Sequence, residues 1–499
     1  MNAALAYALL PWIIIGSTAL ILMLFAAVKR DHLYISFLTS LGLLLALIVQ
    51  LIQISEVDYK DSLVIFDGTT TLLSALIIFV SFLLSLLLYP WLESVNDPKE
   101  EYYMLFLLAT LGSLVVCASS HFASFFLGLE LMSLSLVPMV SYVDRDQKSL
   151  EAGIKYLVLS ALASAFMLMA IAIIYFYAGT LSIDQIVNNS SFILESSATS
   201  GEGLANTVIY NTALVFLLVG VTFKLSLAPC HLWVADLLEG SPLPTAALLA
   251  TISKAAMFVV LIRLFSFGDW HLQTDIVWIL SAVAGVSMIM GNFLALLQKN
   301  ILRLLAFSSI AHFGYLLLTL ISMKPESALA NESALSNEAA IYYLFAYLIT
   351  VLGTFAVLML LNTPHTGPQK PSSAITIDSL RGLFWNKPGT SLTLMLLLLS
   401  LAGIPLTIGF VGKFYVTLAA VNSQLWYLVA ALIISSIAGL YYYLRLIMIM
   451  VEKTDAGESL AKEPFSVTSP ILLTTVSSLV LGIGIFPGHL AEIIEKILT

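Results

Sequence analysis

Long apolar segments follow one another along almost the whole of this chain. A helix needs roughly 20 residues to cross a membrane core, and about fourteen stretches of the sequence are apolar over such a length. Only 10% of the 499 residues are charged, against roughly 25% in soluble domains. The sequence therefore predicts an all-α polytopic membrane protein, with residues 1–499 forming a single membrane domain. The approximate span centres are Ile15, Leu44, Phe82, Leu108, Met132, Met167, Val221, Met257, Val286, Leu317, Leu348, Leu396, Leu432 and Leu479.

Charge and cysteine usage exclude several kinds of partner. The formal charge of −9 includes no basic patch, which argues against nucleic acid. The first apolar segment lacks a basic leader and a small-residue cleavage site, so we expect it to be retained as a helix. Cys117 and Cys230 both lie in or beside apolar segments, where we expect small buried side chains and neither a disulfide nor a metal site.

Basic residues in the loops predict the topology. One set of alternate loops holds most of the loop Lys and Arg, whereas the other set, together with the tails, holds only Lys60, Lys324 and Lys496. Cytoplasmic loops carry the excess of basic residues in membrane proteins. We therefore expect both termini to lie on the side away from the cytoplasm, as an even number of spans requires.

Charged side chains inside the apolar segments are the strongest indication of function. Lys224, Lys254 and Lys413 stand within spans, and Glu130 is the only acid in its own span. A charge at mid-membrane depth costs at least about 2.5–3.5 kcal/mol, so such residues usually mark ion or proton pathways. The first hypothesis is therefore proton or ion translocation.

Two spans are too long for one straight helix, and each contains a helix breaker. A helix from Ala205 to Glu239 would extend roughly 50 Å, but Pro229 should break it just after Lys224. Pro405 should break the second long span, shortly before Lys413. Paired broken helices are typical of transporters with inverted repeats, whereas simple proline kinks are the alternative. We expect N-terminal helices 1–3 in residues 1–100, the two repeats in 101–270 (helices 4–8) and 271–452 (helices 9–13), and a final helix in 465–499.

Proton transfer along this pathway requires titratable partners. A pair between Glu130 and Lys224 that opens and closes would drive proton uptake and release, whereas a static pair would only fix helix positions. His231 and His312 are candidate relays because imidazole titrates near neutral pH, although either residue can be a packing residue. Asp236 and Glu239 lie near the cytoplasmic end of the broken helix, where they would guide proton uptake or act as ordinary loop charges.

Four sequence strings resemble one membrane-protein family. They are GLELMSLSLVPMVSY, KLSLAPCHLWVADLLEGSPLPTAALLATISK, RLLAFSSIAHFGYLLL and LAGIPLTIGFVGKFY. They resemble the antiporter-like membrane subunits of respiratory complex I, and the similarity runs from the first helix to the last. Within this family the chain is similar to the N type, because it has no room for an extra C-terminal lateral helix, Lys413 stands where the M type has glutamate, and ATISK replaces a histidine-bearing segment.

The resemblance implies roles for individual residues. It implies that Glu130 is the fifth-helix glutamate, Lys224 and Lys413 the lysines of the two broken helices, and Lys254 the lysine that connects them. It implies that His312 helps to link the two half-channels. It also implies a bacterial inner-membrane location and partner membrane subunits in the lipid bilayer.

The chain itself shows no motif for electron transfer. It has no dinucleotide-binding glycine pattern after a strand and no cysteine spacing for an iron–sulfur cluster. We therefore expect no cofactor or metal in this chain, with FMN, iron–sulfur clusters, NADH and quinone in partner subunits. Two alternatives remain, a subunit of an Mrp-type cation/proton antiporter and a structural subunit without its own channel.

Overall fold

The structure is a computed structural model. It describes residues 3–54, 56–93, 95, 98–142, 147–186, 203–267, 274–323, 330–362, 375–453 and 468–498. The helices of the first half are α1 (Ala3–Ala8), α2 (Leu10–Val28), α3 (His32–Gln53), α4 (Gly68–Glu93), α5 (Glu100–Ala118), α6 (Phe122–Val140), α7 (Gln147–Ala178), α9 (Gly203–Leu225), α10 (Leu232–Gly240), α11 (Leu243–Ala250) and α12 (Ile252–Phe267). Those of the second half are α13 (Thr274–Leu296), α14 (Ile301–Ile321), α15 (Ala330–Asn362), the 3-10 helix η3 (Ile377–Leu380), α16 (Leu383–Asn386), α17 (Pro388–Ala402), α18 (Ile408–Asn422), α19 (Trp426–Val451), α20 (Thr468–Ile485) and α21 (Gly488–Leu498).

The helices confirm a polytopic membrane protein. In the described part of the chain, 11 helices are long and apolar enough to cross a membrane, or up to 12 if the bent pair at the C-terminal end is counted as one span. Every predicted span centre lies in a helix. Three shorter apolar helices, Asn211–Leu225, Pro388–Ala402 and Ile408–Asn422, belong to the two spans that were predicted to be broken. Lys324, one of the basic residues used for the topology, lies outside the described residues.

The strands of the described residues form a small antiparallel ribbon outside the helices. Strands β1 (Tyr59–Lys60) and β2 (Ile65–Phe66) pair with Tyr59 opposite Phe66. The ribbon lies between α3 and α4, and Val64 forms a bridge with Ser119 at the end of α5. The loop between α3 and α4 is therefore bonded to the loop that follows α5.

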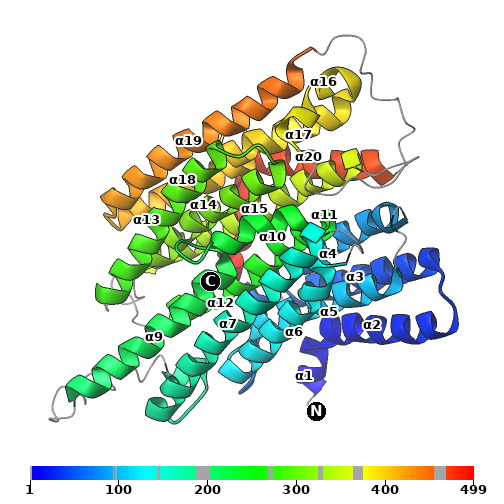
Figure 1. The fold of residues 1–499 in the computed structure, drawn as a ribbon. Coiled ribbons are helices and arrows are strands. Elements are labelled where there is room, and N and C mark those ends of the chain that lie inside the picture. Colours follow the sequence, from blue (N-terminus) through cyan, green and yellow to red (C-terminus); the bar gives the residue numbers. More distant parts are fainter. Residues whose placement is uncertain are drawn as a thin grey trace.

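The elongated bundle has two sides, with α10 to α12 between them (Figure 1). Helices α2 to α7 lie on one side, and α13 to α20 lie on the other. Helix α10 packs against both α7 and α14, and α11 packs against both α6 and α15. Helix α12 packs against α5 as well as α14 and α15. The segment after the first break therefore contacts both sides of the bundle.

Glycines allow the closest helix approaches. A Cβ added at Gly112 in α5 would lie 2.6 Å from the backbone nitrogen of Met132 in α6. A Cβ at Gly291 in α13 would similarly lie 2.7 Å from the backbone nitrogen of Ala311 in α14. Small residues let helix backbones approach in membranes, where packing rather than the hydrophobic effect holds helices together. The helices that carry Glu130 and His312 are therefore each fixed against a neighbour.

Both long spans are broken where the prolines predicted. The first runs from α9 to α10 and is interrupted at residues 226–231, around Pro229. The second runs from α17 to α18 and is interrupted at residues 403–407, around Pro405. Helix α9 ends one residue after Lys224, whereas Lys413 lies five residues inside α18. Lys224 therefore precedes its break in the chain, whereas Lys413 follows its break.

Candidate functional site: a buried row of lysines

Lys224 is held by two serines from neighbouring helices. Its Nζ donates hydrogen bonds to Ser133 Oγ in α6 and Ser160 Oγ in α7, each at 2.7 Å. The lysine side chain is 5% exposed, and both serines are buried. Hydrogen bonds to an ammonium are stronger than those between neutral groups. The serines therefore provide a hydrogen-bonding site for a buried charge inside the bundle.

Glu130 lies beside this site but does not form the predicted pair with Lys224. Ser164 Oγ donates a 2.5 Å hydrogen bond to Glu130 Oε1. Ser160 and Ser164 stand one turn apart on α7, so one serine holds the lysine and the next holds the glutamate. Among the described ion pairs within 4.0 Å, none joins Glu130 to Lys224. In this structure each of the two groups is therefore held by serine hydroxyls rather than by the other group.

The first break is stabilised by a serine of α13 and a tryptophan of α10. Ser287 Oγ of α13 accepts a 2.9 Å bond from the Ala228 backbone nitrogen, and Trp233 Nε1 donates to the Phe223 carbonyl at 3.2 Å. Backbone groups released from a helix must find such partners inside a membrane protein. His231 immediately precedes α10 and is 2% exposed, with no hydrogen-bond partner for either ring nitrogen among the described residues. Its predicted role as a relay stays a prediction.

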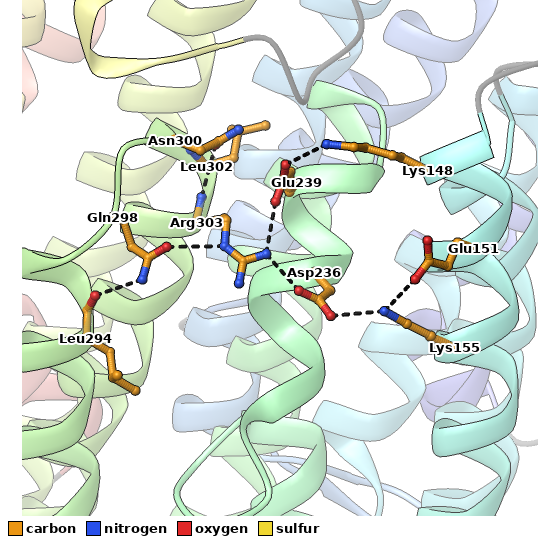
Figure 2. Close-up of polar contacts among 10 residues, drawn as sticks. All are labelled: Lys148, Glu151, Lys155, Asp236, Glu239, Leu294, Gln298, Asn300, Leu302 and Arg303. Carbon is orange, nitrogen blue, oxygen red and sulfur yellow. Dashed lines mark hydrogen bonds and ion pairs between the residues drawn. The ribbon is translucent and has the colours of Figure 1, made fainter.

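The two carboxylates of α10 are ion-paired rather than free in solvent. Asp236 accepts from Lys155 Nζ at 3.0 Å and from Arg303 Nη1 at 2.7 Å. Glu239 accepts from Lys148 Nζ at 3.0 Å and from the same Arg303 atom at 2.9 Å. Figure 2 shows α10 between the lysines of α7 and the arginine of α14. Proton uptake through these two acids stays a prediction, but the structure places them in one ionic network.

Lys254 lies at an interruption that the sequence did not predict. Helix α11 ends at Ala250 and α12 begins at Ile252, and Tyr347 OH donates to the Ala250 carbonyl at 2.9 Å. Lys254 is 1% exposed and donates to Ser309 Oγ of α14 at 2.8 Å. Its Nζ also lies 5.2 Å from the ring centre of Phe313, within cation–π range.

His312 stands one turn after Ser309 on α14, surrounded by tyrosines. Its Nδ1 lies 2.7 Å from Tyr343 OH, a hydrogen-bonding distance. Its ring centre lies 5.7 Å from that of Tyr315 and 5.5 Å from that of Tyr347. All three tyrosines are buried. The histidine is therefore embedded in hydroxyl-bearing aromatic rings rather than in a purely apolar core.

Lys413 caps the end of the half-helix that precedes it. Its Nζ donates to the carbonyls of Leu401 and Ala402 at 3.0 and 2.9 Å, and to Ser436 Oγ at 3.3 Å. These carbonyls are left without partners where α17 ends, and the helix dipole favours a cation there. Gly403 adopts a positive φ of 82°, the common way to end a helix. The second break therefore supplies the binding site for its lysine.

Hydroxyl groups and rings connect Lys254 with Lys413. The route runs from Lys254 to Ser309, along α14 to His312 and on to Tyr343, which packs against Gly412 beside Lys413. The ring centre of Tyr315, which also lies beside His312, is 5.5 Å from Lys413 Nζ. The charged residues could be identified from the sequence, whereas the serines and tyrosines between them were not predicted. Serine at one-turn spacing in α7 and tyrosine at the same spacing in α15 were the available signals.

No group of three or more potential metal ligands is present among the described residues. The row of polar groups consists of ammonium, imidazole, carboxyl and hydroxyl groups. Each of these can donate, accept or carry a proton. The arrangement is therefore suited chemically to passing protons between helices.

Comparison with known proteins identifies the family of the chain. The family model described as "NADH:quinone oxidoreductase/Mrp antiporter, TM" matches residues 119–439. The chain is also 44% identical over 489 residues to NADH-quinone oxidoreductase subunit N of Shewanella woodyi, covering 98% of each chain. The chain belongs to this family. The family match spans both broken helices and every lysine of the row.

Two solved structures have a similar fold. One is a chain of respiratory complex I from Thermus thermophilus with bound aureothin, which is 28% identical with a TM-score of 0.78 and covers 97% of this chain and 98% of its own. The other is a chain of the Mrp complex from Dietzia sp. DQ12-45-1b. It is 18% identical with a TM-score of 0.80, covering 100% of this chain and 97% of its own, and this similarity shows the fold alone.

Proposed function

We propose that the chain is a proton-translocating, antiporter-like membrane subunit of respiratory NADH:quinone oxidoreductase. The 44% identical relative bears the name of subunit N of that enzyme. The observation that carries the transport role is the polar connection from Lys254 through Ser309 and His312 to Tyr343 beside Lys413. It runs from α12, between the two sides of the bundle, across α14 and α15 to α18, so a proton can move along it into the side formed by α13 to α20.

The lysines act in sequence in this proposal. Protons reach Lys224 from the cytoplasmic side, with Glu130 holding or releasing the ammonium as the distance between the two groups changes. Lys254 and His312 carry charge laterally, and Lys413 receives it. Residues 101–270 and 271–452 act as the two inverted repeats, each with one broken helix. The helices at residues 1–100 and 465–499 complete the bundle.

The redox chemistry belongs to partner subunits. NADH oxidation and quinone reduction, with FMN and iron–sulfur clusters, take place outside this chain, which contributes coupled proton movement. The chain lies in a bacterial inner membrane with both termini on the periplasmic side, beside other antiporter-like subunits. Support for this orientation comes from the uneven distribution of basic residues among the loops.

An Mrp-type cation/proton antiporter subunit is the second candidate, favoured by the shared fold with the Dietzia complex. Mild detergent extraction of the native membrane separates the two candidates. Co-migration of the chain with NADH dehydrogenase activity supports the proposal. Migration without that activity, together with sodium-dependent proton movement in vesicles, supports the antiporter.

The transport role is tested by replacing the last lysine of the row. Lys413→Met keeps the length of the side chain but removes the charge, so we expect fewer protons moved per NADH oxidised in membrane vesicles. Lys60→Met is the matched control, because Lys60 is an exposed lysine in β1. An equal loss in both variants, in proportion to lost assembly, would instead support a structural subunit.

A further inference from the structure

Arg303 joins the two sides of the bundle at the end of the first broken helix. It stands in the first turn of α14, and its Nη1 binds one oxygen of Asp236 and one oxygen of Glu239 in α10. Its Nε also donates to Gln298 Oε1 at 3.2 Å. Figure 2 shows these contacts converging on the one guanidinium.

The carboxylates are shared between opposite neighbours. Arg303 takes Asp236 Oδ1, whereas Lys155 of α7 takes Oδ2. Arg303 takes Glu239 Oε2, whereas Lys148 of α7 takes Oε1. Every oxygen of the two acids therefore has a cationic partner, and α10 is held from both sides.

The position of Arg303 is unfavourable for α14 alone. A cation near a helix N-terminus opposes the helix dipole, typically by about 0.3–1 kcal/mol. The first turn of α14 contains no acidic residue. The two acids that neutralise Arg303 come instead from α10, so the favourable contacts of this arginine depend on the position of α10.

Helices α10 and α14 also carry the groups around which the proposed pathway is built. His231 immediately precedes α10, and the Trp233 ring in its first turn stacks on that of Phe223 at 5.0 Å, one residue before Lys224. Ser309 and His312, the partners of Lys254 and Tyr343, lie on α14. A shift of α10 relative to α14 therefore changes the distance between the first break and the side chains of Ser309 and His312.

We propose that Arg303 is a positioning residue for proton translocation, which clamps α10 to α14 and so keeps the first break in register with Ser309 and His312. This inference rests on the proposed function. Arg303 takes no proton in this role and acts through Asp236 and Glu239. Loss of the clamp uncouples the two sides of the bundle while leaving the redox partners intact.

The test compares Arg303→Gln and Arg303→Lys in the assembled complex in membrane vesicles. Arg381→Gln is the matched control, because Arg381 also pairs with two acids, Asp378 and Glu452, but lies away from α10. We expect Arg303→Gln to lower the number of protons moved per NADH oxidised, because loss of the clamp weakens the coupling between the first break and α14. We expect Arg303→Lys to restore part of the loss and Arg381→Gln to leave the ratio unchanged.

Hydrogen exchange on the same membranes separates positioning from general damage. Arg303→Gln should accelerate amide exchange in residues 232–240 by about fivefold or more, with no change in residues 388–402. If Arg303→Gln does not assemble, the same exchange measurement is made on Arg303→Lys. We expect a smaller increase in amide exchange in that variant, confined to α10. An unchanged pumping ratio, or faster exchange throughout the bundle, would overturn the inference.

A Lys224→Ala variant in the same series separates the two levels of the proposal. If Lys224→Ala lowers the ratio and Arg303→Gln does not, the proposed function stands and the role of Arg303 is wrong. If neither variant lowers the ratio, the proposed function itself is wrong.

Discussion

Removal of one hydroxyl from the partner of Lys254 should interrupt proton transfer. Ser309 Oγ donates to the Ala306 carbonyl at 2.7 Å, so its lone pairs face Lys254, which donates to it at 2.8 Å. A hydrogen bond to a charged group contributes about 1.5–3 kcal/mol. At 1.4 kcal/mol per factor of ten, Ser309→Ala should disfavour the ammonium of Lys254 by a factor of roughly 10 to 150. The cation–π contact with Phe313 remains and limits the loss.

The assay is the initial rate of proton uptake into inverted vesicles, divided by the rate of NADH oxidation by the same vesicles. Ser309→Ala should lower this quotient, whereas Ser309→Thr should keep it because the hydroxyl remains. Ser113→Ala is the matched control, since Ser113 is a buried serine of α5 that donates only to the Ala109 carbonyl at 2.8 Å. A normal quotient in Ser309→Ala would refute a role for this hydrogen bond in the lateral step.

Three further changes test separate parts of the structure. Gly409→Ala should abolish assembly or pumping, because the added Cβ would lie 2.0 Å from the Ser400 carbonyl oxygen. Gly482→Ala is the control, because its Cβ meets nothing within 4 Å, and it should leave assembly on a blue-native gel unchanged. Tyr343→Phe should slow proton uptake severalfold with normal NADH oxidation in vesicles, because His312 loses its 2.7 Å partner. Burial lowers the pKa of His121, whose Nδ1 accepts from the Ala123 nitrogen at the start of α6. This helix cap should hold at neutral pH and weaken as the pH falls from about 6.5 through the lowered pKa of His121 in the folded protein. The measurement is the exchange rate of the Ala123 amide, corrected for its intrinsic rate, which should rise as the cap weakens.

Features fixed by local chemistry could be predicted from the sequence. The spans follow from apolar length, and the two breaks follow from Pro229 and Pro405 together with the excess length of their segments. Lys224, Lys254 and Lys413 could be singled out because a charge in an apolar segment is costly wherever it lies. None of these inferences needs knowledge of which helices are neighbours.

Features fixed by helix contacts could not be predicted in the same way. Serine is common in apolar spans, so nothing local marks Ser160 as the partner of Lys224 rather than as a packing residue. The hydroxyls of α7 that hold Glu130 and Lys224 in this structure could not be foreseen for the same reason, and the opening and closing of their pair stays a prediction. Nothing local marks Arg303 as a link between helices, because its partners lie 64 and 67 residues earlier in the chain.

The most direct test of the account is the number of protons translocated per NADH oxidised in vesicles that carry Lys224→Ala, measured after assembly of the complex has been confirmed. Lys224 has two serine partners and almost no exposure to solvent, so its charge has a place only within the row of polar groups. The account predicts a reduced ratio with NADH oxidation partly retained. An unchanged ratio in the fully assembled variant would contradict it and return the buried lysines to a structural role.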